Sequence, residues 1–234
     1  MPSTACRKSP QKTAISAVRP YNGGMRDDLS DFEYERRFFC HTFPDDLNDG
    51  DAPILIIQSY YVHQDNFALR VRLQAHNVRV PMNAETNALA TLGRYRDAFT
   101  DAFVTVKGPS IGGTRYEAER DIDPDVAVEL VLRGGSVIVK NRYGAWLGED
   151  GWDIDVFGGG NAPLIVAEAE RRGPVTDLVI PDFCITEITD DSRFSNDGLA
   201  EHPYAEWNDR FEYELLTKGP HFLEGFGTNR REQQ

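Results

Sequence analysis

The sequence predicts an α+β protein whose core is an antiparallel β-sheet closed into an eight-stranded barrel with peripheral helices. Three observations lead to this fold class. Between residues 31 and 171, apolar and polar side chains alternate in about eight short segments, which is typical of half-buried strands. Most connections between these segments are short, which favours antiparallel neighbours. Seven of the segments also carry charged side chains at alternate positions, and therefore on one face.

Turn residues and short charged loops mark most of the strand boundaries. The run "LGEDG" at 147–151, for example, separates two alternating segments and indicates a tight turn. Two other segments have a helical pattern: 87–99, and 123–135, which begins with an Asp-Pro pair and stops at Gly134. We expect strands at 31–40, 52–62, 67–75, 102–108, 114–122, 136–146, 151–158 and 162–170.

Changes in composition divide the chain into three parts. Residues 1–29 are polar and contain several prolines, so we expect a flexible leader, within which Met25 is an alternative start. A central domain follows over 30–204, with an insertion at about 74–100 between two strands. Towards the end of this domain the period-two pattern fades into loops and short helices, and 205–234 forms a C-terminal extension.

Charge and cysteine content limit the classes of function. The net charge of −13 argues against non-specific binding to nucleic acid or to an anionic membrane. The three cysteines, Cys6, Cys40 and Cys184, lack the spacing of a zinc site and fit a reducing compartment. No apolar run is long enough to span a membrane, and the N-terminus has no apolar signal core. We therefore expect a cytoplasmic protein with no nucleic-acid or membrane partner.

The charged rows are the most informative feature of the sequence. Signs segregate by strand: acids dominate the first, fifth, seventh and eighth strands, and bases dominate the third, fourth and sixth. The opposite face is apolar, with Phe32, Val71, Ile154 and Ala169 among its side chains. The nine acids and seven bases of the charged face are Glu33, Glu35, Glu117, Glu119, Asp121, Asp153, Asp155, Glu168, Glu170, Arg37, Arg70, Arg72, Lys107, Arg115, Lys140 and Arg142.

Two interpretations of this face compete. A solvent-exposed outer face is the common explanation for charges at alternate strand positions, but it would also show serine, threonine and scattered lysine. The near balance of signs instead favours the inside of a closed sheet, because buried charges are costly unless they are paired or neutralised. Such a cavity suits a polyanion on its basic side and a hard divalent cation, Mg²⁺ or Mn²⁺, on its acidic side.

At this point the sequence resembles a known family. The segments "EYERR", "ALRVRL", "TVKG", "RYEAE", "VKNRY", "WDIDVF" and "VAEAE" are similar, in order and spacing, to the CYTH superfamily, the triphosphate tunnel metalloenzymes. The resemblance runs from about Asp31 to Tyr204, and the stretch from Pro181 to Tyr204 is similar to the C-terminal part of bacterial members. It implies an eight-stranded antiparallel tunnel over 30–204.

The resemblance also implies roles for individual residues. The family's E-x-E-x-K signature falls on Glu33, Glu35 and Arg37, with arginine where the family has lysine. The implied catalytic residues are Glu35, Arg37 and Glu170. The implied metal ligands are Glu33, Glu35, Asp155, Glu168 and Glu170. The implied binders of phosphate oxygens are Arg70, Arg72, Lys107, Arg115, Lys140 and Arg142. Further acids of the tunnel, with less defined roles, are Glu117, Glu119 and Asp153.

The activity implied by the resemblance is metal-dependent hydrolysis of a linear triphosphate, with a triphosphate-containing small molecule as the partner. A class IV-type adenylyl cyclase is the first alternative, although no base-reading cluster is visible in the sequence. The second is a non-catalytic polyphosphate or nucleotide sensor, which the arginine at position 37 and the 74–100 insertion would favour. The oligomeric state is left open between a monomer and a homodimer.

Several other motifs have simpler explanations. "GPSIG" at 108–112 matches a nucleophile elbow formally, but a strand rather than a helix follows Ser110, so we expect a hairpin loop. "GGGN" at 158–161 indicates a turn, and the five histidines have no metal-ligand spacing. Trp152 is expected to pack in the core rather than to stack on a base.

Overall fold

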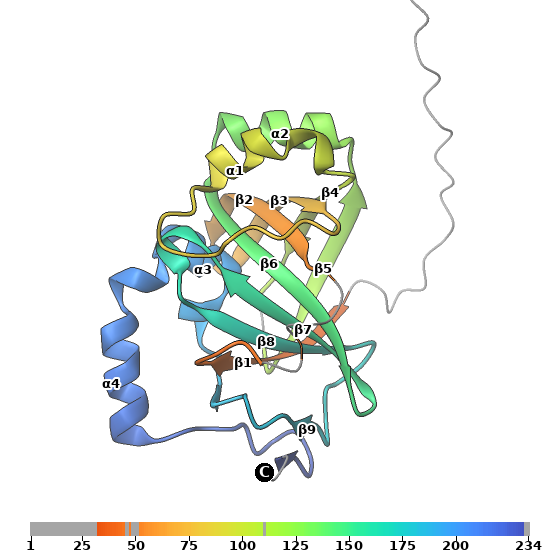
Figure 1. Cartoon of the computed structure of the whole chain (residues 1–234). Coiled ribbons are helices and arrows are strands. Elements are labelled where there is room, and N and C mark those ends of the chain that lie inside the picture. The colour runs from red at the N-terminus through yellow and green to blue at the C-terminus, as the bar shows by residue number, and fades with distance from the viewer. Residues whose placement is uncertain (1–31, 45–46, 48–51, 110, 232–234) are drawn as a thin grey trace, which may run out of the picture.

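The computed structural model describes residues 32–44, 47, 52–109 and 111–231 (Figure 1). Neighbouring strands pair in the order β1-β5-β4-β3-β2-β6-β7-β8, and β8 pairs back onto β1. All of these pairings are antiparallel, so the sheet is a closed eight-stranded barrel, as predicted. Its strands are β1 (Phe32–Cys40), β2 (Ile54–Gln64), β3 (Phe67–Ala75), β4 (Asp101–Lys107), β5 (Thr114–Asp121), β6 (Ser136–Leu147), β7 (Asp150–Phe157) and β8 (Ile165–Arg171).

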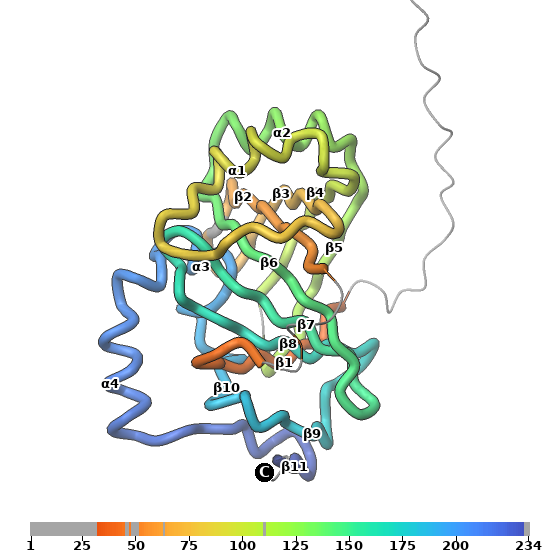
Figure 2. Tube along the Cα trace, in the orientation of Figure 1, coloured from red at the N-terminus to blue at the C-terminus, as the bar shows by residue number. Residues whose placement is uncertain are grey.

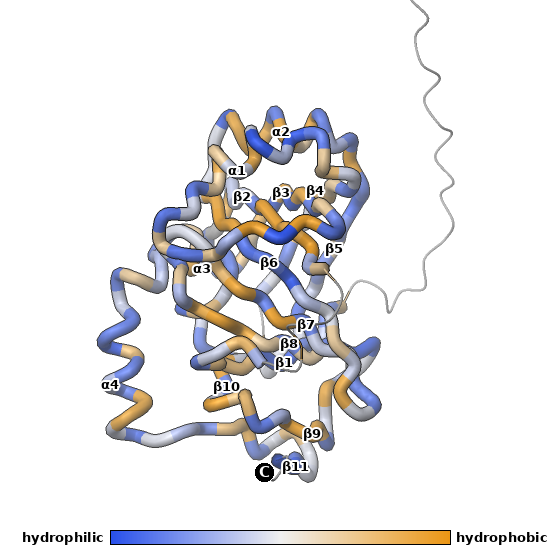
Figure 3. The backbone as a smooth tube through the Cα atoms, in the orientation of Figure 1, coloured by the Kyte–Doolittle hydropathy of each residue, from blue (hydrophilic) through white to orange (hydrophobic). Residues whose placement is uncertain are grey.

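The predicted strands are all present, and their boundaries agree to within about three residues. The predictions for the leader at 1–29, for Cys6 and for Ser110 concern residues outside the described ones. The segments on either side of Ser110 form the predicted β4–β5 hairpin. Figure 3 shows hydrophobic and hydrophilic residues alternating along the strands. That alternation gives the barrel a different interior and exterior.

The two predicted helices cover the outside of the barrel at one end (Figure 1). They are α1 (Ala88–Arg94), which a 3₁₀ turn at Arg96–Ala98 extends, and α2 (Pro124–Arg133). The side chain of Asp123 accepts hydrogen bonds from two backbone N–H groups of the first turn of α2, the capping role that the Asp-Pro pair predicts. A core cluster joins both helices to the outer faces of β2 and β3 through Leu92, Val131, Leu55 and Leu73.

The chain after β8, residues 172–231, is called the C-terminal segment here; it wraps around the barrel, as the tube in Figure 2 shows. Buried residues between Val175 and Cys184 pack on the outer faces of β1, β7 and β8, next to Trp152. The remaining elements are β9 (Val179–Ile180), β10 (Thr186–Glu187), α3 (Asn196–Glu201), α4 (Asn208–Lys218), β11 (Arg230–Arg231) and 3₁₀ turns at Ser192–Phe194 and Tyr204–Glu206. β10 adds to β1, and β11 pairs with β9 in parallel.

An ion pair outside the tunnel fastens this segment to β1. Arg36 has no solvent exposure and donates two hydrogen bonds to the carboxylate of Glu187, at 2.8 and 2.6 Å. A third bond goes from Arg36 to the side chain of Asn229, at 2.7 Å. Glu187 also accepts the backbone N–H of Leu223, so both ends of the C-terminal segment meet at one buried pair.

The same segment closes one end of the barrel. Four inward-facing positions, Phe39, Ile138, Phe157 and Val166, are apolar rather than charged at that end. They form a buried cluster with Phe194, Leu199, Tyr204 and other residues of the C-terminal segment.

The "GGGN" stretch forms the 3₁₀ turn Gly159–Asn161, which contacts the segment that closes the barrel. Gly159 has a φ of +65°, and a Cβ there would lie 2.8 Å from the backbone carbonyl oxygen of Thr86, so glycine lets the insertion approach the turn this closely. The side-chain nitrogen of Asn161 donates to the carbonyl of Leu199, and its side-chain oxygen accepts from the N–H of Tyr204. The turn therefore holds both the insertion and the C-terminal segment, a role that its sequence alone does not reveal.

No helix in the described part of the chain is long and apolar enough to cross a membrane.

Candidate functional site

The charged rows face inward, and they surround a cavity of about 240 Å³. The alternative of a solvent-exposed outer face is thereby excluded for the residues that line this cavity. Twelve of the predicted site residues are among them: Glu33, Glu35, Arg70, Arg72, Lys107, Arg115, Glu117, Glu119, Lys140, Arg142, Glu168 and Glu170.

The cavity is open at one end and closed at the other. On β3 the exposed fraction of the side chain falls from 17% at Arg72 to 4% at Arg70. On β7 it falls from 39% at Asp153 to 0% at Asp155. The buried members lie towards the end that the C-terminal segment covers, so within the described residues the tunnel has one mouth and a floor.

The basic side chains are already paired with carboxylates. Lys107 lies 2.9 Å from Glu33 and 2.8 Å from Glu117, and Arg115 lies 2.8 Å from Glu33. Burial opposes ionisation of Glu33, but these two cations outweigh it and lower the pKa of Glu33 well below its usual range. These ion pairs balance part of the charge in a crowded interior.

The arginines of β3 retain unused hydrogen-bonding capacity. Glu119 accepts from Arg70 at 3.1 Å and from Arg72 at 3.0 Å. Each arginine nevertheless has a buried Nε–H with no acceptor in the described residues. Unsatisfied buried donors are costly, so this side of the cavity suits a ligand with many acceptor oxygens.

Two carboxylates face each other across the seam between β1 and β8. Glu35 is the direct cross-strand partner of Glu170, a like-charged pair that destabilises a sheet unless a cation lies nearby. Burial and the charge of Glu33 raise the pKa of Glu35, against the effect of Arg37. Burial and then repulsion by Glu33, Glu168 and Glu35 raise the pKa of Glu170 to about 7.

This group of acids has the chemistry of a hard-cation site. Carboxylate oxygens are the ligands that Mg²⁺ and Mn²⁺ prefer, and Glu170 has no hydrogen bond or ion pair in the described residues. The acids do not form a ready-made cage: no three carboxylate, histidine or cysteine side chains of the described residues cluster closely enough. Glu33 and Glu168 instead bind Arg115 and Arg142, so a cation would have to displace these bases.

Asp155 and Asp153 are placed differently from the sequence prediction. Neither lines the cavity. Asp155 is fully buried beneath Lys140 and Arg142, which overcome the effect of burial and lower its pKa to about 2. Asp153 accepts from Arg142 at 2.8 Å near the mouth. Both acids orient bases of the tunnel wall, so a metal-ligand role for Asp155 has no support in this geometry.

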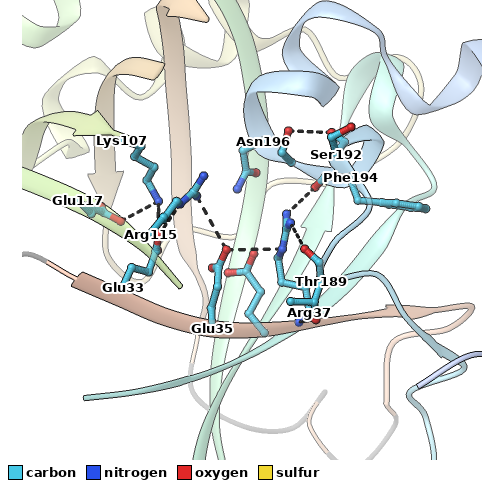
Figure 4. A network of polar contacts seen from close by, with 12 residues as sticks. Glu33, Glu35, Arg37, Lys107, Arg115, Glu117, Thr189, Ser192, Phe194 and Asn196 are labelled. Carbon is cyan, nitrogen blue, oxygen red and sulfur yellow. Dashed lines mark hydrogen bonds and ion pairs between the residues drawn. The ribbon is translucent and has the colours of Figure 1, made fainter. Parts of the chain in front are cut away.

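Arg37 does not line the cavity, although Figure 4 shows its side chain on the same side of β1 as that of Glu35. Its terminal nitrogens donate to the backbone carbonyls of Phe194 and Thr189, each at 3.0 Å. Its Nε lies 3.5 Å from Glu35. The catalytic role of Arg37 stays a prediction; the C-terminal segment binds both terminal nitrogens of its guanidinium, and only its buried Nε–H has no acceptor in the described residues.

Three residues that line the cavity were absent from the predicted site: Phe32, Gln58 and Asn196. Phe32 was expected on the outer face, but it is the first residue of β1 and lies half-exposed at the edge of the cavity. Gln58 pairs with Arg72 in register, so strand alternation could have placed it inside. Asn196 comes from α3, and no periodic signal in the sequence points to it.

The other motifs behave as simple structural features. Trp152 is buried and packs on Phe38, with ring centroids 5.6 Å apart, so it cannot stack on a ligand. The side chains of His41, His76, His202 and His221 do not line the cavity.

Known proteins resemble this chain in sequence and in fold. No family model matches the chain. Over 104 residues the chain is 36% identical to the inorganic triphosphatase of Acetivibrio thermocellus, a match that spans 44% of this chain and 67% of that protein. Among solved structures, the inorganic triphosphatase NE1496 is 26% identical, with a TM-score of 0.46, over 72% of this chain and 93% of the other.

A putative adenylyl cyclase from Hippeastrum, described as having a dominant triphosphatase activity, is 15% identical, with a TM-score of 0.38, over 59% of this chain and 79% of the other. The closed antiparallel barrel and its charged interior make this chain a tunnel protein. The match to two thirds of the Acetivibrio triphosphatase then shows that the chain belongs to the CYTH superfamily of triphosphate tunnel metalloenzymes.

Proposed function

We propose that this protein hydrolyses the terminal phosphoanhydride of a linear triphosphate such as inorganic tripolyphosphate, with Mg²⁺ or Mn²⁺. The observation that carries the proposal is the division of one cavity into a basic wall and an opposed pair of carboxylates, Glu35 and Glu170. The name of the Acetivibrio relative supports the same reaction.

The basic wall would hold the substrate. Arg70 and Arg72 line the cavity from β3 and Lys140 from β6, on either side of β2, so they can contact different phosphates of one chain. Each charge-assisted hydrogen bond contributes roughly 1.5–3 kcal/mol. Substrate oxygens would take the place of Glu119 on the two arginines, which also satisfies their unused donors.

The acidic side would hold the metal. Glu33, Glu35, Glu168 and Glu170 supply hard oxygen donors, and a divalent ion bound there would neutralise phosphate charge and lower the pKa of a water nucleophile. When the substrate takes over Lys107, Arg115 and Arg142, it frees carboxylates that these bases now occupy. Binding of substrate and of metal would therefore favour each other.

Arg37 and Asp155 would act as positioning residues. Arg37 connects Glu35 to the C-terminal segment, and Asp155 fixes Lys140 and Arg142 against the wall. Catalysis would then rest mainly on positioning and electrostatics, as in phosphoryl transfer generally.

The cavity gives less support to a cyclase. Cyclisation of ATP needs a surface that binds adenine, and Phe32 is the one aromatic side chain among the described lining residues. A sensor remains the alternative to be separated by experiment.

The test is phosphate release from tripolyphosphate, pyrophosphate and ATP, each with Mg²⁺, Mn²⁺ or EDTA. We expect orthophosphate from tripolyphosphate with metal and none in EDTA. Glu35→Gln should abolish turnover, whereas Glu85→Gln, the same charge change at an exposed site, should not. Cyclic AMP as the main product of ATP would favour the cyclase, and tight binding without turnover would favour the sensor.

A further inference from the structure

Two amide side chains stand among the charged residues that line the tunnel. They are Gln58 on β2 and Asn196, the first residue of α3. Gln58 is buried, and its nitrogen donates to the hydroxyl of Tyr60 at 3.0 Å. Asn196 accepts from the ammonium group of Lys140 through its side-chain oxygen, at 3.4 Å. Asn196 therefore keeps both of its N–H donors, whereas Gln58 uses one of its two.

Asn196 lies at the floor of the tunnel. Phe194 and Leu199, its neighbours in the chain, are buried in the apolar cluster that closes the barrel. Lys140, which it contacts, is among the most buried bases of the wall. Figure 4 shows the side chain of Asn196 pointing from α3 towards the space between Arg115 and Arg37. No acceptor for its nitrogen is present in the described residues.

Asn196 is only half-buried, and its amide nitrogen is accessible to a ligand in the cavity. The acids near it are engaged with bases. A bound phosphate would supply the missing acceptor. The end of a phosphate chain is the part that would reach this floor, because the tunnel has one mouth in the described residues.

We propose that Asn196 binds the terminal phosphate of the substrate at the floor of the tunnel and so selects linear polyphosphates that have an unsubstituted end. This inference rests on the proposed function and adds the direction of binding. The substrate enters end-first, and its unsubstituted phosphate places oxygens against Asn196 and Lys140. An esterified end would have to fit its substituent where Phe194 and Leu199 already pack.

The matched variants are Asn196→Asp and Asn208→Asp. Each replaces the first residue of a helix and adds one negative charge, but Asn208 begins α4 and does not line the tunnel. Asn196→Asp keeps an oxygen for Lys140 and replaces the donor with a like charge for the phosphate. Circular dichroism and melting curves of the full chain establish that both variants fold.

Binding is measured by calorimetry in excess Mg²⁺ with imidotriphosphate, a linear analogue that resists hydrolysis, and with cyclic trimetaphosphate, which has no end. For imidotriphosphate we expect Asn196→Asp to lose roughly 10- to 100-fold in affinity. We expect no comparable loss for the cyclic compound, and none for Asn208→Asp with either ligand. The parent protein should bind ATP, which has one free end, more tightly than P1,P3-diadenosine triphosphate, which has none.

Three results would overturn the inference: equal binding of imidotriphosphate by the two variants, an equal loss for linear and cyclic ligands, or equal affinity of the parent for ATP and the diadenosine compound. These are distinct from failure of the proposed function. Binding with the expected pattern but without turnover of tripolyphosphate refutes hydrolysis alone, and turnover that Asn196→Asp leaves unchanged refutes the role of Asn196 alone.

Discussion

Replacing Glu170 with glutamine should stabilise the metal-free protein at pH 8. Glu170 stands directly opposite Glu35 in the β1–β8 pairing, and Glu33 and Glu168 also repel it. Burial and these neighbours raise its pKa from 4.5 to about 7. Ionising Glu170 in the folded state therefore costs free energy that glutamine does not incur.

The size of the effect follows from that pKa. At about 1.36 kcal/mol per pKa unit, the rise from 4.5 to about 7 sets a ceiling of about 3.4 kcal/mol. Glu170 is more than one-third exposed, and solvent screening reduces this to roughly 1–2 kcal/mol. For a chain of this length, such a gain raises the melting temperature by roughly 2–8 °C.

The pH dependence has a definite sign. A carboxyl group with a raised folded pKa binds its proton more tightly when folded, so its penalty is absent below pH 4.5 and complete above about pH 7. The difference in melting temperature between Glu170→Gln and the parent should thus be small at pH 5 and largest at pH 8, in EDTA. Excess Mg²⁺ should stabilise the parent more than the variant, because the variant lacks one carboxylate ligand.

The assay is a melting curve in EDTA and in Mg²⁺ at both pH values, with Glu85→Gln as the exposed control. A Glu170→Gln variant no more stable than the parent at pH 8 in EDTA would show that the acids do not repel each other as the geometry implies. A stabilisation independent of pH would contradict the assigned pKa.

The remaining predictions concern the wall, the outer ion pair and the leader. Arg70→Ala and Lys140→Ala should weaken binding of tripolyphosphate far more than of orthophosphate, measured by calorimetry; equal losses would argue against several phosphate subsites. Arg36→Ala leaves the buried carboxylate of Glu187 without its cation and should lower the unfolding free energy by roughly 3–5 kcal/mol in urea titrations; a loss below about 1 kcal/mol would contradict the burial of this pair. Deleting residues 1–28 should leave activity and melting temperature nearly unchanged, and a large drop in either would show that the leader binds the barrel.

The barrel and most of the cavity lining were predictable from side-chain alternation. In a closed antiparallel barrel each strand turns every second residue inward, so a period-two pattern determines the face of a residue such as Arg72 or Glu119. Alternation needs no knowledge of contacts that are distant in sequence. It does not give the ion-pair partners, which depend on strand order: Arg72 on β3 binds Glu119 on β5, with β4 between them.

The contacts that the charged end of a long side chain makes were not predictable from alternation. Arg37 belongs to the predicted row, but carbonyl groups of Phe194 and Thr189, more than 150 residues away, bind its guanidinium. Asp155 is on the predicted strand face, but it is the anion beneath two bases rather than a lining residue. Such outcomes depend on tertiary contacts that irregular segments make, and the sequence after residue 174 has little periodicity from which to infer them.

These irregular segments determine the geometry at the acidic row. The outer edge of β1 pairs with β5 as far as Tyr34 and with β10 only from Phe38 onward. Between these residues, the N–H of Glu35 donates to the carbonyl of Gly113 at 2.9 Å, and the N–H of Arg37 donates to the hydroxyl of Thr189 at 3.1 Å. Glu35 therefore sits where regular pairing of this edge is interrupted and single contacts replace the ladder. Since one of those contacts comes from the C-terminal segment, the segment that closes the tunnel also fixes the backbone of β1 two residues from Glu35, the carboxylate to which we assign the central role.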